Sequence, residues 1–130
     1  MAEWQLVQEW LHKADEDLNF AASIIEDSTF YAQICFHFQQ SAEKYLKALV
    51  VADDLEFQKI HDLVTLLKIC LGSRPDLASL MPSCRLLNRF YTDTRYPVHW
   101  PTDYTKDKAI QAQAAAEKIR DTIKTCLAKP

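Results

Sequence analysis

Arg95 and His99 share one short segment, YTDTRYPVHWP (residues 91–101), with three residues between them. An arginine guanidinium can hold a phosphate through its planar fork, and a histidine can move protons near neutral pH. The pair therefore carries the groups needed for metal-independent RNA cleavage. In such a reaction histidine assists attack by the 2′-hydroxyl, and arginine stabilises the phosphorane.

The same segment can instead hold a nucleotide without cleaving anything. Arg95 would clamp the phosphate, and the neighbouring rings of Tyr96 and Trp100 could stack on a base. A purely structural alternative also stands, in which Arg95 forms a salt bridge that pins the loop, with Asp93 or Asp103 as its partner. Prolines within residues 94–104 predict an ordered loop rather than a helix.

A second set of polar side chains lies in the stretch FHFQQSAEKYLKALV, residues 36–50. At about 100° per residue, the apolar residues of a helix here form one broad stripe. On nearly the opposite side, or at its margin, lie four residues with polar or charged side chains: His37, Gln40, Lys44 and Lys47. They form either a binding surface or an ordinary solvated helix face, in which Glu43 pairs with Lys47 one turn away.

The elements that must position these residues are helices. A single glycine, an apolar content of 48% and the lack of strict alternation favour an all-α protein and disfavour sheets. Apolar spacing and capping residues predict helices over residues 3–27, 30–52, 61–71, 82–92 and 105–127, with a short helical turn after residue 75. The chain of 130 residues fits one domain, residues 1–130, built as a helical bundle.

Composition narrows the function classes further. A net charge of −3 gives no overall attraction to nucleic acid or to an anionic membrane, although a local basic patch remains compatible with it. No apolar run is long enough to span a bilayer or to resemble a signal peptide. The four cysteines, scattered in apolar contexts, predict reduced core residues of a cytoplasmic protein. No metal or cofactor motif is present, so none is expected.

With these residues laid out, the chain resembles the HEPN family. The matching blocks are WLHKADEDL (10–18), CFHFQQSAEKYLKAL (35–49), HDLVTLL (61–67) and YTDTRYP (91–97). The resemblance implies an up-and-down bundle of four main helices with a shorter fifth. It also implies a homodimer with a polar cleft. Many small prokaryotic members resemble toxins paired with a minimal nucleotidyltransferase, and others are linked to nucleotide binding.

The chain departs from the family's ribonuclease pattern at one point. In the ribonuclease members at least one more residue separates the arginine from the histidine, and here Pro97 also lies between Arg95 and His99. A regular helix through this segment is therefore disfavoured. The departure weakens the case for cleavage, whereas phosphate binding by Arg95 needs no histidine at a fixed spacing.

Three hypotheses follow. The chain is a nucleotide- or RNA-binding module that acts as a dimer with a nucleotidyltransferase partner. Its binding residues would then be Arg95, Tyr96, Trp100, His37, Gln40, Lys44 and Lys47. Alternatively it is a metal-independent endoribonuclease that uses Arg95 and His99, or a dimeric adaptor with no small-molecule site.

Overall fold

The computed structural model describes residues 3–57, 59–93 and 104–128. Within them the chain forms helices and no strand, so the predicted all-α class is confirmed. The elements are α1 (Trp4–Ile24), α2 (Tyr31–Ala52), α3 (Leu63–Leu71), the 3-10 helix η1 (Pro75–Leu80), α4 (Met81–Asn88), α5 (Phe90–Asp93) and α6 (Lys106–Ala128). The predicted boundaries of the first three helices and the last helix agree with these to within a few residues.

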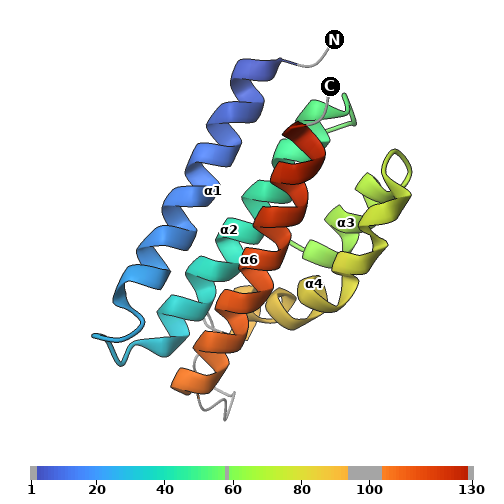
Figure 1. Ribbon diagram of the computed structural model, residues 1–130. Coiled ribbons are helices and arrows are strands. Elements are labelled where there is room, and N and C mark those ends of the chain that lie inside the picture. The colour runs from blue at the N-terminus through green and yellow to red at the C-terminus, as the bar shows by residue number, and fades with distance from the viewer. Residues whose placement is uncertain (1–2, 58, 94–103, 129–130) are drawn as a thin grey trace.

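The long helices α1, α2 and α6 lie side by side (Figure 1). Helix α2 runs antiparallel to α1, the shorter α3 and α4 flank the side away from α1, and α6 returns in front of α2 (Figure 1). This is the predicted up-and-down bundle, in which short helices take the third position (Figure 1). Of the described helices, none is both long and apolar enough to cross a membrane.

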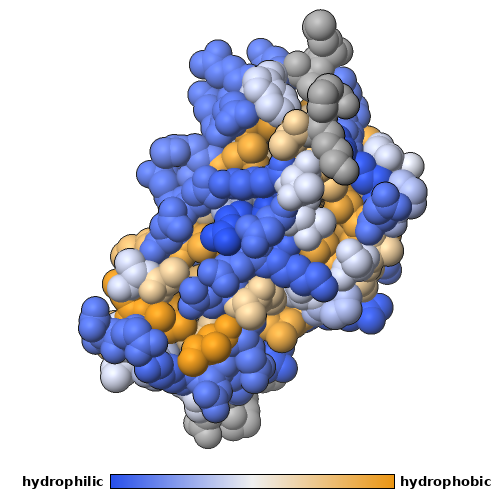
Figure 2. Space-filling model, viewed as in Figure 1, coloured by the Kyte–Doolittle hydropathy of each residue, from blue (hydrophilic) through white to orange (hydrophobic). Residues whose placement is uncertain are grey.

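The core forms where the apolar stripes of α1 and α2 meet. Phe38, Tyr45 and Leu46 are completely buried, as their helical spacing predicts. The apolar spacing of the first predicted helix also includes Trp4, but this residue, at the first turn of α1, is 52% exposed. The face of the molecule in Figure 2 is largely hydrophilic, with hydrophobic patches in the furrows between helices.

Helix α6 packs through alanine rather than through all of its larger apolar residues. Apolar spacing in the sequence predicts the inner side of α6 at Ile110, Ala114, Ile119, Ile123 and Cys126. Ile119 and Ile123 are buried, whereas Ile110 and Ala114 are exposed. The buried stripe consists of Ala109, Ala112, Ala115, Ala116, Ile119 and Ile123. Small side chains let two helix axes approach closely, so the alanine side of α6 can be the buried one even though Ile110 is then left exposed.

The predicted helix over residues 82–92 is divided. Helix α4 ends at Asn88, and α5 begins at Phe90 after a turn at Arg89. Asn88 has another role at this break, because its Oδ1 accepts a hydrogen bond from the backbone N–H of Leu63 at 2.7 Å. The break lets α5 turn back against α2, which positions the site described below.

The four cysteines carry free thiols, as predicted. Cys35, Cys70 and Cys84 are buried, and Cys126 is partly buried. Burial raises the pKa of the Cys35 thiol to about 12 and that of Cys70 to about 11. These thiols are therefore protonated core groups and poor nucleophiles at neutral pH.

Candidate functional site

The outer face of α2 is covered in part by α5 and by the connection between α2 and α3. Tyr91 of α5 stacks on the His61 ring, with the ring centroids 4.5 Å apart and an interplanar angle of 12°. Tyr91 also contacts Phe36 of α2 at 6.2 Å between ring centroids. These contacts hold the start of α5 against α2, immediately before the segment that contains Arg95.

His61 is fixed from its other side by a buried carboxylate. Its Nδ1 lies 3.1 Å from Oε1 of Glu43. The position of His61 and Asp62 at a predicted helix start favours local capping contacts for both residues. For His61 the partner is instead on α2. Asp62 does cap α3, because its carboxylate accepts a hydrogen bond from the N–H of Thr65 at 2.9 Å. That hydrogen bond is the main cause of a lowered pKa for Asp62.

Glu43 forms a buried ion pair with Lys47. Nζ of Lys47 lies 2.9 Å from Oε2 of Glu43, and the two side chains are only 8% and 5% exposed. The same ammonium lies 5.7 Å from the ring centroid of Trp10 and 5.8 Å from that of Phe57. Lys47 is therefore enclosed by a carboxylate and two rings, and its charge is compensated within the protein.

A second carboxylate, that of Asp17, contacts α2 nearer its N-terminus. Asp17 of α1 pairs with Nζ of Lys44 through Oδ2, and its Oδ1 lies 3.3 Å from Nδ1 of His37. The exposed ring of Phe20 packs edge-on against His37, with the ring centroids 5.0 Å apart. Lys44 remains 25% exposed, so a ligand can reach it, but Asp17 would compete with an anion for its charge.

Gln40 completes the predicted face and joins a short polar chain. Its Nε2 donates to Oε1 of Gln39 at 2.8 Å, and Gln39 in turn donates to the backbone carbonyl of His61 at 3.3 Å. Gln39 is completely buried. The network joins α2 to the connection that precedes α3, so both the backbone and the ring of His61 contact side chains of α2.

The structure thus brings together His37, Gln40, Lys44 and Lys47 on one face of α2, which we call the α2 polar face. The four remaining site residues of the prediction lie outside the described residues: Arg95, Tyr96, His99 and Trp100. The expected loop over residues 94–104 falls there too, apart from Tyr104. Sequence reasoning named the Glu43–Lys47 pair, as part of a solvated face, but missed its burial, and it missed Asp17 as the partner of Lys44 and His37.

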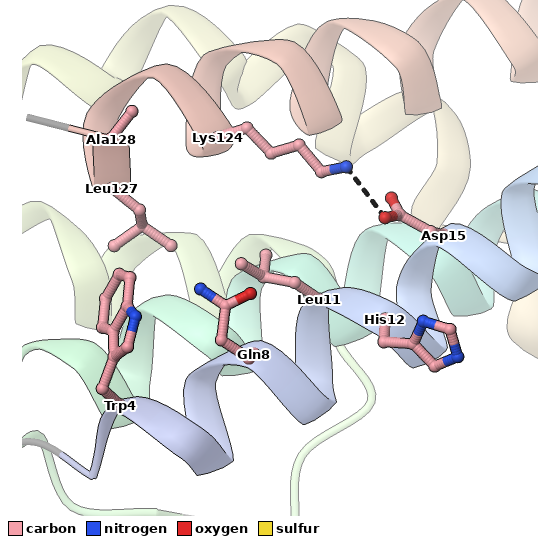
Figure 3. A pocket seen from close by; sticks show the side chains of 8 residues that line it. All are labelled: Trp4, Gln8, Leu11, His12, Asp15, Lys124, Leu127 and Ala128. Carbon is pink, nitrogen blue, oxygen red and sulfur yellow. Dashed lines mark hydrogen bonds and ion pairs between the residues drawn. The ribbon is translucent and has the colours of Figure 1, made fainter.

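A cavity of about 350 Å³ lies elsewhere, between the beginning of α1 and the end of α6 (Figure 3). Trp4 and Leu127 form its apolar end, and Asp15 and Lys124 pair at 2.8 Å at the other (Figure 3). Asp15 also accepts a hydrogen bond from the buried hydroxyl of Tyr45 at 2.5 Å. Burial and that bond raise the pKa of Tyr45. None of the predicted site residues lines this cavity.

Comparison with known proteins decides the family. The HEPN domain model matches residues 7–126. The chain belongs to the HEPN family. A relative named putative toxin MJ1304, from Methanocaldococcus jannaschii, is 24% identical over 131 residues, covering 91% of this chain and 86% of the relative.

Two solved structures share this HEPN fold. TT1696 from Thermus thermophilus matches with a TM-score of 0.77 at 28% identity, over 92% of this chain and 96% of that one. ST0689, described as an archaeal HEPN homologue, matches with a TM-score of 0.74 at 28% identity, over 92% and 95% of the two chains. The resemblance inferred from the sequence blocks is therefore confirmed.

Proposed function

We propose that this HEPN protein is a nucleotide- or RNA-binding helical module that acts as a dimer, paired with a minimal nucleotidyltransferase in a toxin–antitoxin-type system. The observation that supports this best is the packing of α5 against α2. Tyr91 lies on His61 and Phe36, so α5 packs beside the α2 polar face. In the sequence, Arg95 follows the last residue of α5 by two positions.

In this proposal Arg95 clamps a phosphate, while Tyr96 or Trp100 stacks on a base. His37, Gln40 and Lys44 line the polar wall. Lys47 supports the wall instead of touching the ligand, because its ammonium is already enclosed by Glu43 and two rings. The proposal thus keeps the predicted residues but divides them into ligand contacts and support.

The dimer and the partner rest on the family and on the exposed rings beside this face. Phe20 is 50% exposed and Phe57 is 46% exposed, at opposite ends of the α2 polar face. Exposed aromatic rings flanking a polar strip are typical of a surface that another chain covers. The relative named as a toxin supports the assignment to a toxin–antitoxin-type pair.

Asp17→Asn and Lys44→Gln should change ligand affinity in opposite directions. Asp17 compensates the charge of Lys44, so removing the carboxylate should strengthen binding of single-stranded RNA or ATP by about threefold, and removing the lysine should weaken it by about as much. Fluorescence anisotropy and calorimetric titration measure the two affinities. Matched controls are Glu16→Gln and Lys13→Gln, exposed residues of the same α1 helix. If each control shifts affinity as much as its counterpart, only net charge matters and the α2 polar face is not the binding wall.

The alternative of a metal-independent endoribonuclease is kept because a relative carries the name of a toxin. Incubation of mixed cellular RNA with the protein and EDTA, beside a His99→Ala variant, tests it. We expect no cleavage by either protein, because the Arg95–His99 spacing is short and interrupted by Pro97. Cleavage by the wild type alone would establish the ribonuclease and displace the binding-only proposal.

A further inference from the structure

A groove between α4 and α6 gathers cations away from the α2 polar face. One part of it is a hollow of about 380 Å³, lined by Arg85, Leu86, Arg89, Phe90, Lys108 and Gln111. Arg85 lies on α4, and Arg89 is the turn residue that directly follows this helix, four positions after Arg85. Lys108 faces them from the first turns of α6. The hollow therefore receives positive charge from both of its walls.

The hollow continues along the two helices. A neighbouring depression of about 410 Å³ shares Leu86 and Gln111 with it and extends past Ala114 to Lys118. Leu86 and Ala114 give the floor an apolar character, while Lys118 adds a cation at the far end. We call the two together the α4–α6 basic groove.

The cations of this groove are not compensated within the described residues. Several basic side chains elsewhere in the described chain are paired, as Arg74 is with Asp53, Arg120 with Asp121 and Lys106 with Glu26. By contrast, Arg85, Arg89 and Lys108 form no ion pair there. In a chain with 15 basic and 18 acidic residues, such a gathering is against the overall balance. A local basic patch is compatible with the net charge of the chain, and this groove is such a patch.

Aromatic rings hold two of these cations in place without neutralising them. The Arg89 guanidinium lies 5.6 Å from the ring centroid of Phe90, and Nζ of Lys108 lies 5.6 Å from that of Tyr104. A ring face attracts a cation but leaves its net charge and its outward N–H groups available. The dipole of α6 adds positive potential at the same end of the groove, since Lys108 lies near the helix N-terminus.

We propose that the α4–α6 basic groove binds the phosphate groups of the ligand, either consecutive phosphates of a single-stranded RNA or the phosphates of a nucleotide. This inference rests on the proposed function and names a second place of contact for it. Phe90 lines the groove, and the Tyr104 ring contacts Lys108, one of the cations of the groove. Guanidinium forks match phosphate geometry, which favours phosphate over a diffuse acidic partner.

The test is the salt dependence of binding by the full chain. Anisotropy titrations use a fluorescein-labelled single-stranded RNA of mixed sequence at several salt concentrations, and ATP is titrated separately. Removing one cation that neutralises a phosphate should reduce the slope of log affinity against log salt by about 0.7 for a single strand. Arg85→Gln/Arg89→Gln should therefore flatten the RNA slope by about 1.4, and Arg85→Gln alone by about 0.7. The Arg85 side chain is exposed and forms no hydrogen bond or ion pair with any other described residue, so the single variant should fold normally.

Lys13→Gln/Lys68→Gln is the matched control, because it removes the same charge from exposed positions outside the groove. An unchanged slope in the control and a flattened one in the groove variants supports the proposal, with RNA as the source of the phosphates. Loss of ATP binding in the groove variants with the RNA slope unchanged also supports it, with a nucleotide as the source.

Three results would overturn the inference. Binding by the wild type that responds equally to groove and control variants removes the groove but leaves the proposed function standing. Equal competition by poly-glutamate of similar length shows recognition of charge alone, not phosphate. Absence of any saturable binding of RNA or ATP by the wild type removes both this inference and the proposed function.

Discussion

Replacing Lys47 with methionine is expected to lower the free energy of unfolding by about 3 kcal/mol. The substitution keeps the length of the side chain between Trp10 and Phe57 but leaves the buried carboxylate of Glu43 without its closest cation. His61, which is half exposed, still contacts Glu43 in this variant. The expected loss of free energy of unfolding is therefore at the lower end of the range for a broken buried ion pair. Urea denaturation followed by circular dichroism measures the change.

Two further variants make this test specific. Lys68→Met, on the exposed side of α3, should change stability by less than about 0.5 kcal/mol. Lys47→Met/Glu43→Leu should recover much of the loss, because an apolar pair of similar volume needs no compensation for a buried charge. A single variant as stable as the wild type would mean that the pair is solvated in solution and that Lys47 is free to meet a ligand.

Arg95→Ala is expected to weaken binding of the preferred ligand by about thirtyfold, because it removes a charge-assisted hydrogen bond to phosphate worth about 2 kcal/mol. The described cations of the α2 polar face are already paired with Asp17 and Glu43, so the proposed function assigns the phosphate contact to Arg95. Anisotropy with single-stranded RNA and calorimetry with ATP measure the effect, beside Arg74→Ala as a control that removes an arginine paired to Asp53. Equal affinities for Arg95→Ala and the wild type would remove Arg95 from the site.

The helical class and the composition of the α2 polar face could be predicted because both follow from spacing along one helix. Periodicity places His37, Gln40 and Lys44 opposite the core stripe, and the structure finds them on one face. Periodicity does not show what covers that face. Lys47 and Glu43 are buried because Trp10 of α1 and Phe57, in the connection between α2 and α3, pack over them. These contacts join residues that are far apart in the chain.

Other differences have the same origin in tertiary packing. Ile110 has the apolar character of a core residue, yet α6 turns its alanine ridge inward and leaves it exposed. The turn at Arg89 could not be read from residues 82–92, whose pattern is that of a continuous helix. Asn88 stabilises the break by accepting a bond from the start of α3, a partner 25 positions away in sequence.

The cations of the α4–α6 basic groove could not be predicted from the sequence either. Arg85, Arg89 and Lys108 belong to no motif, and on separate helices each resembles an ordinary surface residue. Only the packing of α4 beside α6 brings them around one hollow. Arg95, Tyr96, His99 and Trp100 were named from the sequence and lie outside the described residues, so their roles remain predictions.

The proposed binding function is tested most directly by titrating the wild-type protein with fluorescein-labelled single-stranded RNA and, separately, with ATP. We expect saturable binding of at least one of them, weakened as salt is raised. Saturable binding of neither ligand, by a protein whose circular dichroism shows the intact helical bundle, would contradict this function. The chain would then be an adaptor that works through protein contacts alone.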